Sequence, residues 1–503
     1  MNILDEIKII ENYNAGVSEI VSLIKETNRD LKNQIGNLNV EIIDLTNLVS
    51  SLREENFGLL ARNIQLETMQ NKNSNNSSKP PSTDNNKKPL NSRKKTGRSS
   101  GGQSGHEGST LLKIENPDNI IDIKNETCNC GCNLSDIDGK IKTRQVFDLP
   151  QVFINVTEYR THEVLCPDCK QVHKTEFPVT ISQPVQYGDN LQALMVYLSN
   201  YQLVPLARTT EIIKTLTGKN ISQGTVVNAN NRLYNSLEMF EDAIKDKLKN
   251  AEVLHVDESG LRLKGKINWV HVASTSRITH YAIHKKRGAI ATNEIGILPD
   301  FEGTMVHDHW KPYYTFKNCT HAECNAHNMR ILKGISENFG HIWAVDMGNL
   351  LVDIKREVDS LKSRGVTFMA ESNIKAYDGK YKTIIAQGKI EDGEKSSGML
   401  LTKTGKPVKS DALKLLRKLE EYDVETLSFM YDFNIPFDNN LAERDIRMVK
   451  LRQKISGCFR SDNGGSLFCR IRSYISTCNK NGEDIMESLK SAIKGEPFIP
   501  EKL

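Results

Sequence analysis

Leucine recurs at every seventh position near the start of the chain, and this repeat constrains the fold more than any other feature. The leucines are Leu31, Leu38, Leu45, Leu52, Leu59 and Leu66. Three positions before them stand Asn28, Ile35, Ile42, Val49, Asn56 and Asn63. Leucine at d with β-branched residues at a favours a parallel dimeric coiled coil, and asparagine at a specifies its register. We predict that residues 1–70 form a coiled coil that makes the chain a homodimer or higher oligomer. The alternative is an amphipathic helix packed on its own globule.

A polar, basic segment follows at residues 71–110. It is rich in Asn, Ser, Gly and Pro, nearly lacks large apolar residues, and carries eight Lys/Arg against two acidic residues. Such a segment cannot bury enough apolar surface to offset the entropy of ordering, so we predict a disordered linker. Its basic cluster is a candidate for contact with DNA phosphates. The cluster consists of Arg93, Lys94, Lys95 and Arg98.

Five of the ten cysteines lie within residues 128–169. Cys166 and Cys169 have the C-x-x-C spacing with which two thiolates bind one zinc ion. The other half offers Cys128, Cys130 and Cys132, without that spacing. We predict that residues 111–178 form a small β module around structural Zn²⁺, completed by two of these three cysteines. A redox site is the less favoured alternative.

The formal net charge of the chain is only +4, so affinity for nucleic acid must come from local patches. The first residues are partly acidic and lack the apolar core of a signal peptide, and no apolar stretch is long enough to cross a membrane. We expect a multidomain protein that is cytoplasmic, associated with the nucleoid, and without a membrane partner.

Residues 179–250 have a helical pattern. One helix ends at Gly218, and a second begins around Thr225 with Ser222 as its N-cap. This succession is typical of a helix-turn-helix segment that binds DNA. Helices that pack together without contacting DNA are the alternative.

From residue 251 onward, short apolar runs alternate with polar positions. A turn is expected at Lys264–Gly265 and a helix over 288–297, and the predicted strands are 251–258, 268–275, 278–286 and 303–309. Strands with an intervening helix predict a mixed sheet with helices on its faces. The α/β domain spans 251–478, with a helical insertion at about 328–432, a helix over 438–457 and a tail at 479–503.

Two aspartates are expected to end strands of this sheet, Asp257 and Asp308. Carboxylates beyond strand ends, joined by a third from a helix, suit Mg²⁺ or Mn²⁺, and such ions assist phosphodiester cleavage. Glu443 is a candidate third carboxylate, although its spacing to Arg447 also fits an ordinary surface ion pair. Arg444, Arg447 and Lys450 on the same segment add positive charge that suits phosphate, and we predict that they contact DNA.

The histidines around Asp308 are weaker candidates. On a regular strand His307 and His309 share one face while Asp308 takes the other, so the three cannot bind one ion. We expect the two histidines to pack or to contact DNA. A second set has the spacing of one helical face and is a weak zinc candidate, with a packed thiol and a hydrogen-bonded histidine favoured. This set is His321, Cys324 and His327.

Several blocks of the sequence, in this order, resemble transposases of the insertion sequence 66 family, and nearly the whole chain fits. The blocks are "NNSSKPPSTD", "GGQSGHEG", "LHVDESG", "VHDHWKPY", "CNAHNMR" and "DNNLAERDIR". The resemblance implies a zinc-binding domain and a ribonuclease-H-like catalytic fold with a DDE triad. Carried over, the triad falls on Asp257, Asp308 and Glu443, and Cys324 and His327 form a pair that supports the fold. The chain departs from the family in its irregular first cysteine group and its short C-terminal tail.

The resemblance implies a transposase that binds terminal inverted repeats and catalyses metal-dependent DNA cleavage and strand transfer, that is, DNA transposition and recombination. Its partners are double-stranded DNA and accessory proteins encoded by the same element. The zinc module, the helix-turn-helix-like segment and the basic linker would bind the repeats. Two alternatives remain, a non-catalytic DNA-binding dimer and a metal-dependent nuclease without strand transfer.

Overall fold

A computed structural model describes residues 2–73, 76–77, 112–123, 129–131, 133–136, 141–148, 154–169, 171–396 and 410–501. The basic cluster of the linker lies outside these residues, as do Cys128 and Cys132. The chain divides into two compact units. Unit 1 contains Met1–Asn85, Val306–His309 and His321–Asn439, and unit 2 contains Asn86–Met305, Trp310–Thr320 and Asn440–Leu503.

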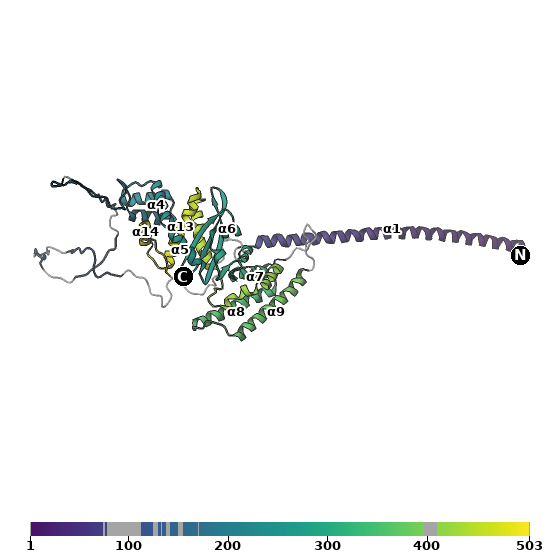
Figure 1. Cartoon of the computed structure of the whole chain (residues 1–503). Coiled ribbons are helices and arrows are strands. Elements are labelled where there is room, and N and C mark those ends of the chain that lie inside the picture. Colours follow the sequence, from purple (N-terminus) through teal and green to yellow (C-terminus); the bar gives the residue numbers. More distant parts are fainter. Residues whose placement is uncertain are drawn as a thin grey trace. The chain divides into compact units, whose positions relative to one another are not determined.

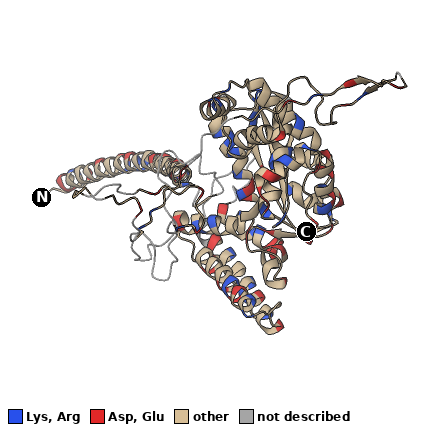
Figure 2. Cartoon of the chain, turned by 90° about the vertical axis from the view of Figure 1, so that its left-hand side faces the viewer, with Lys and Arg blue, Asp and Glu red and all other residues tan. Residues whose placement is uncertain are grey.

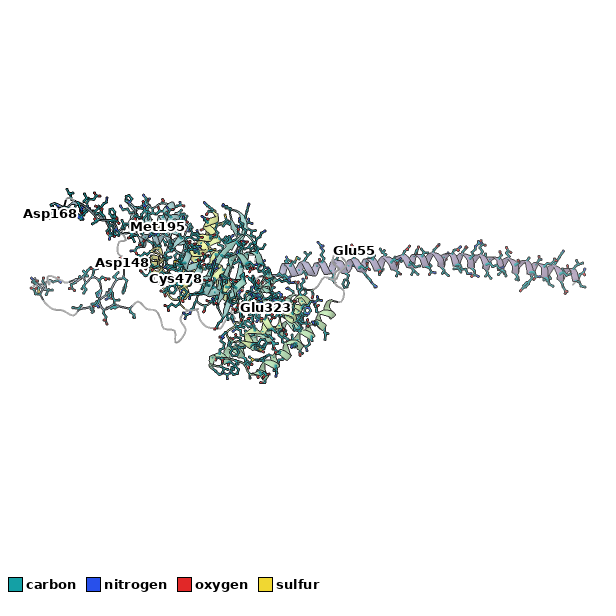
Figure 3. The ribbon with its side chains drawn as sticks, viewed as in Figure 1. Glu55, Asp148, Asp168, Met195, Glu323 and Cys478 are labelled. Atoms are coloured by element: carbon teal, nitrogen blue, oxygen red, sulfur yellow. The ribbon has the colours of Figure 1, made fainter. Side chains whose placement is uncertain are left out.

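The N-terminal segment is one continuous helix, α1 (Ile3–Asn71), of 69 residues (Figure 1). The helix predicted for residues 1–70 is thereby confirmed. Its six heptad leucines are between 49% and 60% exposed, and side chains project from the helix along its length (Figure 3). Acidic and basic side chains are interspersed along it (Figure 2). Burial of these leucines against a second helix would recover the free energy that their exposure costs, so the coiled coil stays a prediction for α1.

The predicted mixed sheet is present and has a fifth strand, β7, that the sequence did not predict; the strand order is β5-β4-β3-β6-β7. β3, β4 and β5 are antiparallel neighbours. The Thr320 and Cys324 amides donate to the Gly303 and His307 carbonyls, at 3.0 and 2.9 Å. Both bonds span seventeen positions, so β6 and β7 run parallel. The strands are β3 (Val253–Leu263), β4 (Lys266–Ser274), β5 (Thr279–His284), β6 (Thr304–His307) and β7 (Thr320–Glu323).

The β3–β4 hairpin turns at the two residues that the sequence predicts. Lys264 and Gly265 have φ angles of 49° and 77°, between the paired residues Leu263 and Lys266. Positive φ at both central positions gives a turn whose twist matches the flanking strands, and glycine accepts it without strain. β3 itself runs on to Leu263, five residues beyond the predicted strand end at Glu258.

Helices of unit 2 pack on the sheet. α5 (Glu238–Lys249) and α13 (Asp462–Lys480) contact β5, and α12 (Asn440–Ser456) contacts β3 and β4 (Figure 1). Ala442, Ile446 and Val449 recur at helical spacing and bury the inner face of α12. The remaining helical segments are α2 (Asp189–Val196), η2 (Tyr197–Tyr201), α3 (Leu206–Thr217), α4 (Gln223–Ser236), α6 (Ala289–Ile295), η3 (Leu298–Asp300), η4 (Lys311–Thr315) and α14 (Ile485–Ile493).

The predicted break between α3 and α4 is confirmed. Gly218 ends α3 in the left-handed conformation with a φ of 73°. The Ser222 hydroxyl caps α4 by accepting the Thr225 amide at 3.0 Å. A capped helix and a glycine stop are local signals, which explains why the sequence alone located them.

Unit 1 contains a helical group with its own core. α8 (Ile342–Ser363) and α9 (Glu371–Ser396) lie side by side (Figure 1). Buried Trp343, Leu416 and Phe429 belong to the core between these helices and their neighbours. The neighbours are α7 (Asn325–Phe339), α10 (Asp411–Glu421) and α11 (Asp423–Tyr431). None of the helices within the described residues combines the length and the apolar character that crossing a membrane requires.

The heptad repeat leads to a prediction about association. Leu45 at a d position and Val40 on the opposite side of α1 are 60% and 59% exposed in the single chain. We expect Leu45→Asp to shift the protein from dimer to monomer and Val40→Asp to leave the dimer intact, because only the first side chain would enter the partner interface. Light scattering after size exclusion measures both masses. Equal behaviour of the two variants would refute the coiled coil.

Close packing of α9 leads to a second prediction. A Cβ added at Gly388 would lie 2.6 Å from Leu416 Cδ2 and 2.9 Å from Trp343 Cγ, whereas one added at Gly379 meets nothing within 4 Å. We expect Gly388→Ala to lower the free energy of unfolding by about 1–3 kcal/mol through overpacking. Gly379→Ala on the same helix should raise it by about 0.5–1 kcal/mol. Urea denaturation monitored by circular dichroism measures both, and a stabilised Gly388→Ala variant contradicts the packing.

Candidate active site

Asp257 lies in the middle of β3, not at the strand end that the sequence suggested. The strand continues because the apolar pattern resumes after Gly260, where Leu261 and Leu263 are buried within the β3–β4 hairpin. Asp257 Oδ1 accepts the backbone amide of Glu258 at 2.8 Å, which fixes the carboxylate. The aspartate is partly exposed between buried neighbours, so a carboxylate is held near the core and still meets solvent.

The start of α12 carries the second acidic candidate of unit 2. Glu443 lies in its first turn, where a carboxylate complements the positive end of the helix dipole. Arg447 Nη2 is 3.6 Å from Glu443 Oε2, which confirms the predicted ion pair. Arg444 is exposed on the same helix.

Lys450 joins α12 to β3. Its Nζ donates to the carbonyl of Gly260. Burial lowers the pKa of Lys450, and the negative charge of Asp257 opposes that effect. The Lys450 ammonium and the Asp257 carboxylate are therefore close enough to interact electrostatically. Positive charge therefore lies close to the first aspartate.

Asp308 follows directly after β6 in unit 1. His307, the last residue of β6, is fully buried and donates from Nδ1 to the carbonyl of Asp308. Its Nε2 lies 3.0 Å from Nδ1 of His321 and accepts in this tautomer. Burial lowers the pKa of His307 to about 3, so the ring is neutral near pH 7. The neutral imidazole positions the backbone of Asp308.

The predicted alternation of the three residues is wrong because β6 ends at His307. Asp308 and His309 lie beyond the strand, where period-two alternation no longer applies. The two histidines contact different partners on β7. His307 contacts His321, and His309 contacts Glu323.

Glu323 was not singled out in the sequence, yet its side chain is 1% exposed and strongly bonded. Its Oε1 accepts from His309 Nδ1. Its Oε2 lies 3.0 Å from Lys418 Nζ and accepts from Asn328 at 3.3 Å. Lys418 also donates to Asn328 Oδ1 at 2.8 Å. A buried carboxylate is tolerated only with such compensation. The cluster ties β7 and the residue after Asp308 to α10.

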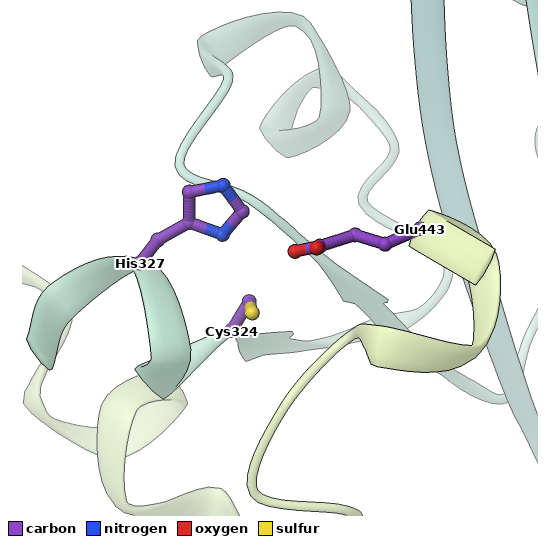
Figure 4. A group of neighbouring side chains, drawn as sticks. All are labelled: Cys324, His327 and Glu443. Carbon is purple, nitrogen blue, oxygen red and sulfur yellow. The ribbon is translucent and has the colours of Figure 1, made fainter. Parts of the chain in front are cut away.

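Cys324 and His327 lie at the junction of β7 and α7 (Figure 4). Cys324 precedes α7 and accepts the Asn439 amide on its Sγ at 3.1 Å, and His327 lies in the first turn of the helix. The sulfur and a ring nitrogen of His327 are within 4.8 Å of each other. Burial lowers the pKa of His327 to about 4. His321 belongs to β7, so the predicted shared helical face for the three residues is wrong. Figure 4 also draws Glu443, on α12.

A second buried carboxylate, Glu258, anchors the segment after Asp308 within unit 2. Its Oε1 accepts from Arg287 Nε and Nη2 at 2.9 and 2.6 Å, and Tyr313 donates to its Oε2. The Arg287 guanidinium lies 4.8 Å from the ring centre of Trp269 and 4.5 Å from that of Trp310. Sequence reasoning missed this cluster because its members are distant in the chain.

The C-x-x-C pair lies on a hairpin of β1 (Glu163–Leu165) and β2 (Val172–Lys174). The Cys166 amide donates to the Gln171 carbonyl at 2.9 Å, which closes the loop between the strands. A hydrogen bond from the Cys169 backbone lowers the pKa of the Cys166 thiol, which favours the thiolate that zinc requires. Cys130 is described and exposed. The zinc module stays a prediction.

The Glu323 cluster gives a stability prediction. Glu323→Gln removes the charge opposite Lys418, a side chain that is 12% exposed, and should cost roughly 3 kcal/mol of unfolding free energy. Glu420→Gln breaks the exposed pair with Lys389 and should cost less than about 1 kcal/mol. Urea unfolding of the two variants provides the measurement. Similar values for both would show that the buried pair contributes nothing beyond a surface pair.

Comparison with known families follows the same order along the chain. The sequence model of a family described as "Transposase IS66 family" matches residues 184–467, more than half of the chain. This range includes Asp257, Asp308 and Glu443. A family of unknown function, DUF6444, matches residues 19–111. No curated protein matches the chain. With its mixed sheet, its carboxylates and this match, the chain belongs to the IS66 family of transposases.

Proposed function

We propose that this transposase is a DDE-type enzyme that cleaves DNA at the ends of its element and joins the freed ends to target DNA. Asp257, Asp308 and Glu443 are its catalytic carboxylates and hold Mg²⁺ or Mn²⁺. The observation that carries this proposal is that Asp257 belongs to β3 and that Asp308 directly follows the neighbouring strand β6.

The strand positions support the aspartate pair. β3 and β6 are hydrogen-bonded neighbours, and the Thr304 amide donates to the Glu252 carbonyl at 2.8 Å, so the two strands begin together. Asp257 is the fifth residue of β3, and Asp308 is the fifth residue counted from Thr304. Equal counts from a common start favour backbone positions at one level of the sheet, with Asp257 within β3 and Asp308 directly after β6.

The donor set fits the implied metal. Three carboxylates offer hard oxygen ligands, the kind that Mg²⁺ and Mn²⁺ prefer. When bound, such ions supply activation of water and neutralisation of charge on the phosphate. Asp257 is oriented by the Glu258 amide, and the Asp308 backbone by His307. Lys450 brings positive charge close to Asp257, and a fixed group of this kind lowers the barrier without reorganisation.

The order of the strands supports a ribonuclease-H-like catalytic domain. Three antiparallel strands, β3 to β5, are followed by the parallel pair β6 and β7, with helices packed against the sheet. The helical group α7 to α11 then stands between Asp308 and Glu443 as an insertion. In this proposal Cys324 and His327 support the junction of sheet and insertion.

The remaining modules would recognise and pair the DNA ends. The zinc module around Cys166 and Cys169, the α3–α4 pair and the basic linker would bind the terminal inverted repeats of double-stranded DNA. α1 would pair two protomers, so that two ends are held together. Accessory proteins of the same element and a place at the nucleoid belong to the same proposal.

The triad is tested by changing Asp308. We expect Asp308→Ala to lower Mg²⁺-dependent cleavage of matched element-end DNA by at least about a hundredfold, since a preorganised charge of the site is lost. Asp346→Asn, an exposed aspartate of α8, should leave the rate unchanged. A gel assay that follows both nicking and joining is the measurement. Undiminished cutting by Asp308→Ala would exclude the triad.

The same assay separates the two rivals. A non-catalytic DNA-binding dimer would bind the ends without nicking them at any Mg²⁺ concentration. A nuclease without strand transfer would nick but never join the freed 3′-hydroxyl to a second duplex. The proposal requires both products from the unaltered protein.

A further inference from the structure

A cavity of about 280 Å³ lies between α12 and α13 of unit 2, next to η2. Arg444 and Asn479 line it and are exposed, so they stand at its mouth. Arg472 and Lys480 line it as well and are mostly buried, with 5% of Arg472 and 15% of the Lys480 side chain exposed. The cavity therefore has a solvent-facing mouth and a deep cationic floor.

Positive charge exceeds negative charge in this lining. Arg444, Arg472 and Lys480 face one carboxylate among the lining residues, that of Asp445. Lys480 Nζ is 2.8 Å from Asp445 Oδ2 and also donates to the carbonyls of Thr275 and Ile278. The hydrogen-bonding capacity of Lys480 is thus used, and Asp445 Oδ2 also accepts from the Thr279 hydroxyl at 3.2 Å. Two buried cations with one carboxylate between them leave a net positive charge, which is costly at low dielectric unless an anion enters.

Arg472 has one buried donor without an acceptor. Its Nη1 donates to the carbonyls of Asn200 and Tyr201 at 3.4 and 3.3 Å, and its guanidinium lies 5.5 Å from the Tyr201 ring centre. Its Nε is buried and has no hydrogen-bond partner among the described residues. Burial lowers the pKa of Arg472, which reports the same cost of desolvation. A buried N–H without an acceptor costs free energy and is rare in folded proteins.

We propose that this cavity binds a phosphate group of the DNA backbone. The positive charge of Arg472 lies beneath the phosphate, while Arg444 and the Asn479 amide donate to its oxygens at the mouth. Guanidinium groups match the geometry of phosphate, and the volume accommodates one such group with its flanking sugar atoms. The inference rests on the proposed function, since it takes DNA as the source of the phosphate.

The cavity lies at the start of the helix that carries Glu443. Arg444 is the next residue along α12, and α13, which also lines the cavity, packs on β5 of the same unit. A strand with one phosphate in the cavity would pass the first turn of α12. The cavity would thereby set the register of the DNA strand along that helix, because phosphate contacts position a duplex without reading its sequence.

Arg444→Met and Asn479→Ala at the mouth test the proposal without touching the buried floor. Element-end DNA is bound in EDTA, which separates binding from cleavage, and anisotropy is recorded over a range of salt concentrations. We expect Arg444→Met to weaken binding several-fold and to reduce the slope of log K against log salt by about 1. Arg277→Met, an exposed arginine between β4 and β5, is the control and should change neither quantity. Unchanged affinity and slope in Arg444→Met would overturn the proposal.

Arg472 is tested by two variants: Arg472→Lys keeps the positive charge, and Arg472→Met removes it. We expect the lysine variant to retain part of the DNA affinity and the methionine variant to lose it, at equal thermal stability by circular dichroism. If Arg472→Met unfolds the protein, the DNA affinities of Arg444→Met and Asn479→Ala decide whether the cavity binds phosphate.

A binding experiment with inorganic phosphate does not depend on DNA cleavage. We expect millimolar phosphate to raise the melting temperature of the unaltered protein and to compete with DNA, and Arg444→Met to reduce both effects. Phosphate binding that the mouth variants abolish without any change in DNA affinity would assign the cavity to free phosphate and overturn the DNA assignment. Failure of cleavage with intact, Arg444-dependent DNA binding would refute the DDE proposal and leave the phosphate site standing.

Discussion

The hydrogen-bonded pairing of β3 is the constraint on which the rest of the α/β core depends. β3 pairs with β4 on one side and neighbours β6 on the other, so it is the central strand of the sheet. Its alternation places Asp257 and Glu258 in different surroundings. A shift by one residue would exchange them and turn the apolar residues outward. The register of one hairpin therefore decides which acid meets solvent and which is buried.

Buried charges, each with fixed partners, hold the segments around the candidate carboxylates. Glu258 binds Arg287 and Tyr313, and thereby anchors the segment that follows Asp308. Glu323 does the same for His309 through β7. Ion pairs of this kind contribute little net stability compared with apolar packing, but breaking one of them is costly. Their effect is to define one arrangement of loops whose sequences alone would allow several.

Local signals were predicted well from the sequence. The helix of α1, the stop at Gly218, the cap at Ser222 and the turn at Lys264–Gly265 all depend on residues within one or two turns of each other. The end of β3 was misjudged because the polar stretch at Asp257 resembles a loop, while pairing with β4 keeps it in the sheet. β7 was missed because four residues carry too short a pattern to distinguish a strand.

The amino-acid sequence by itself determined the heptad repeat, the C-x-x-C pair, the strand alternation and the order of the motifs that identify the family. Each of these is a matter of spacing along the chain. Only the tertiary structure decided that Glu323 and Glu258 are buried, and that Arg444, Arg472 and Lys480 line one cavity. These residues meet across long stretches of sequence, and burial and electrostatic compensation arise only when the folded chain brings them together.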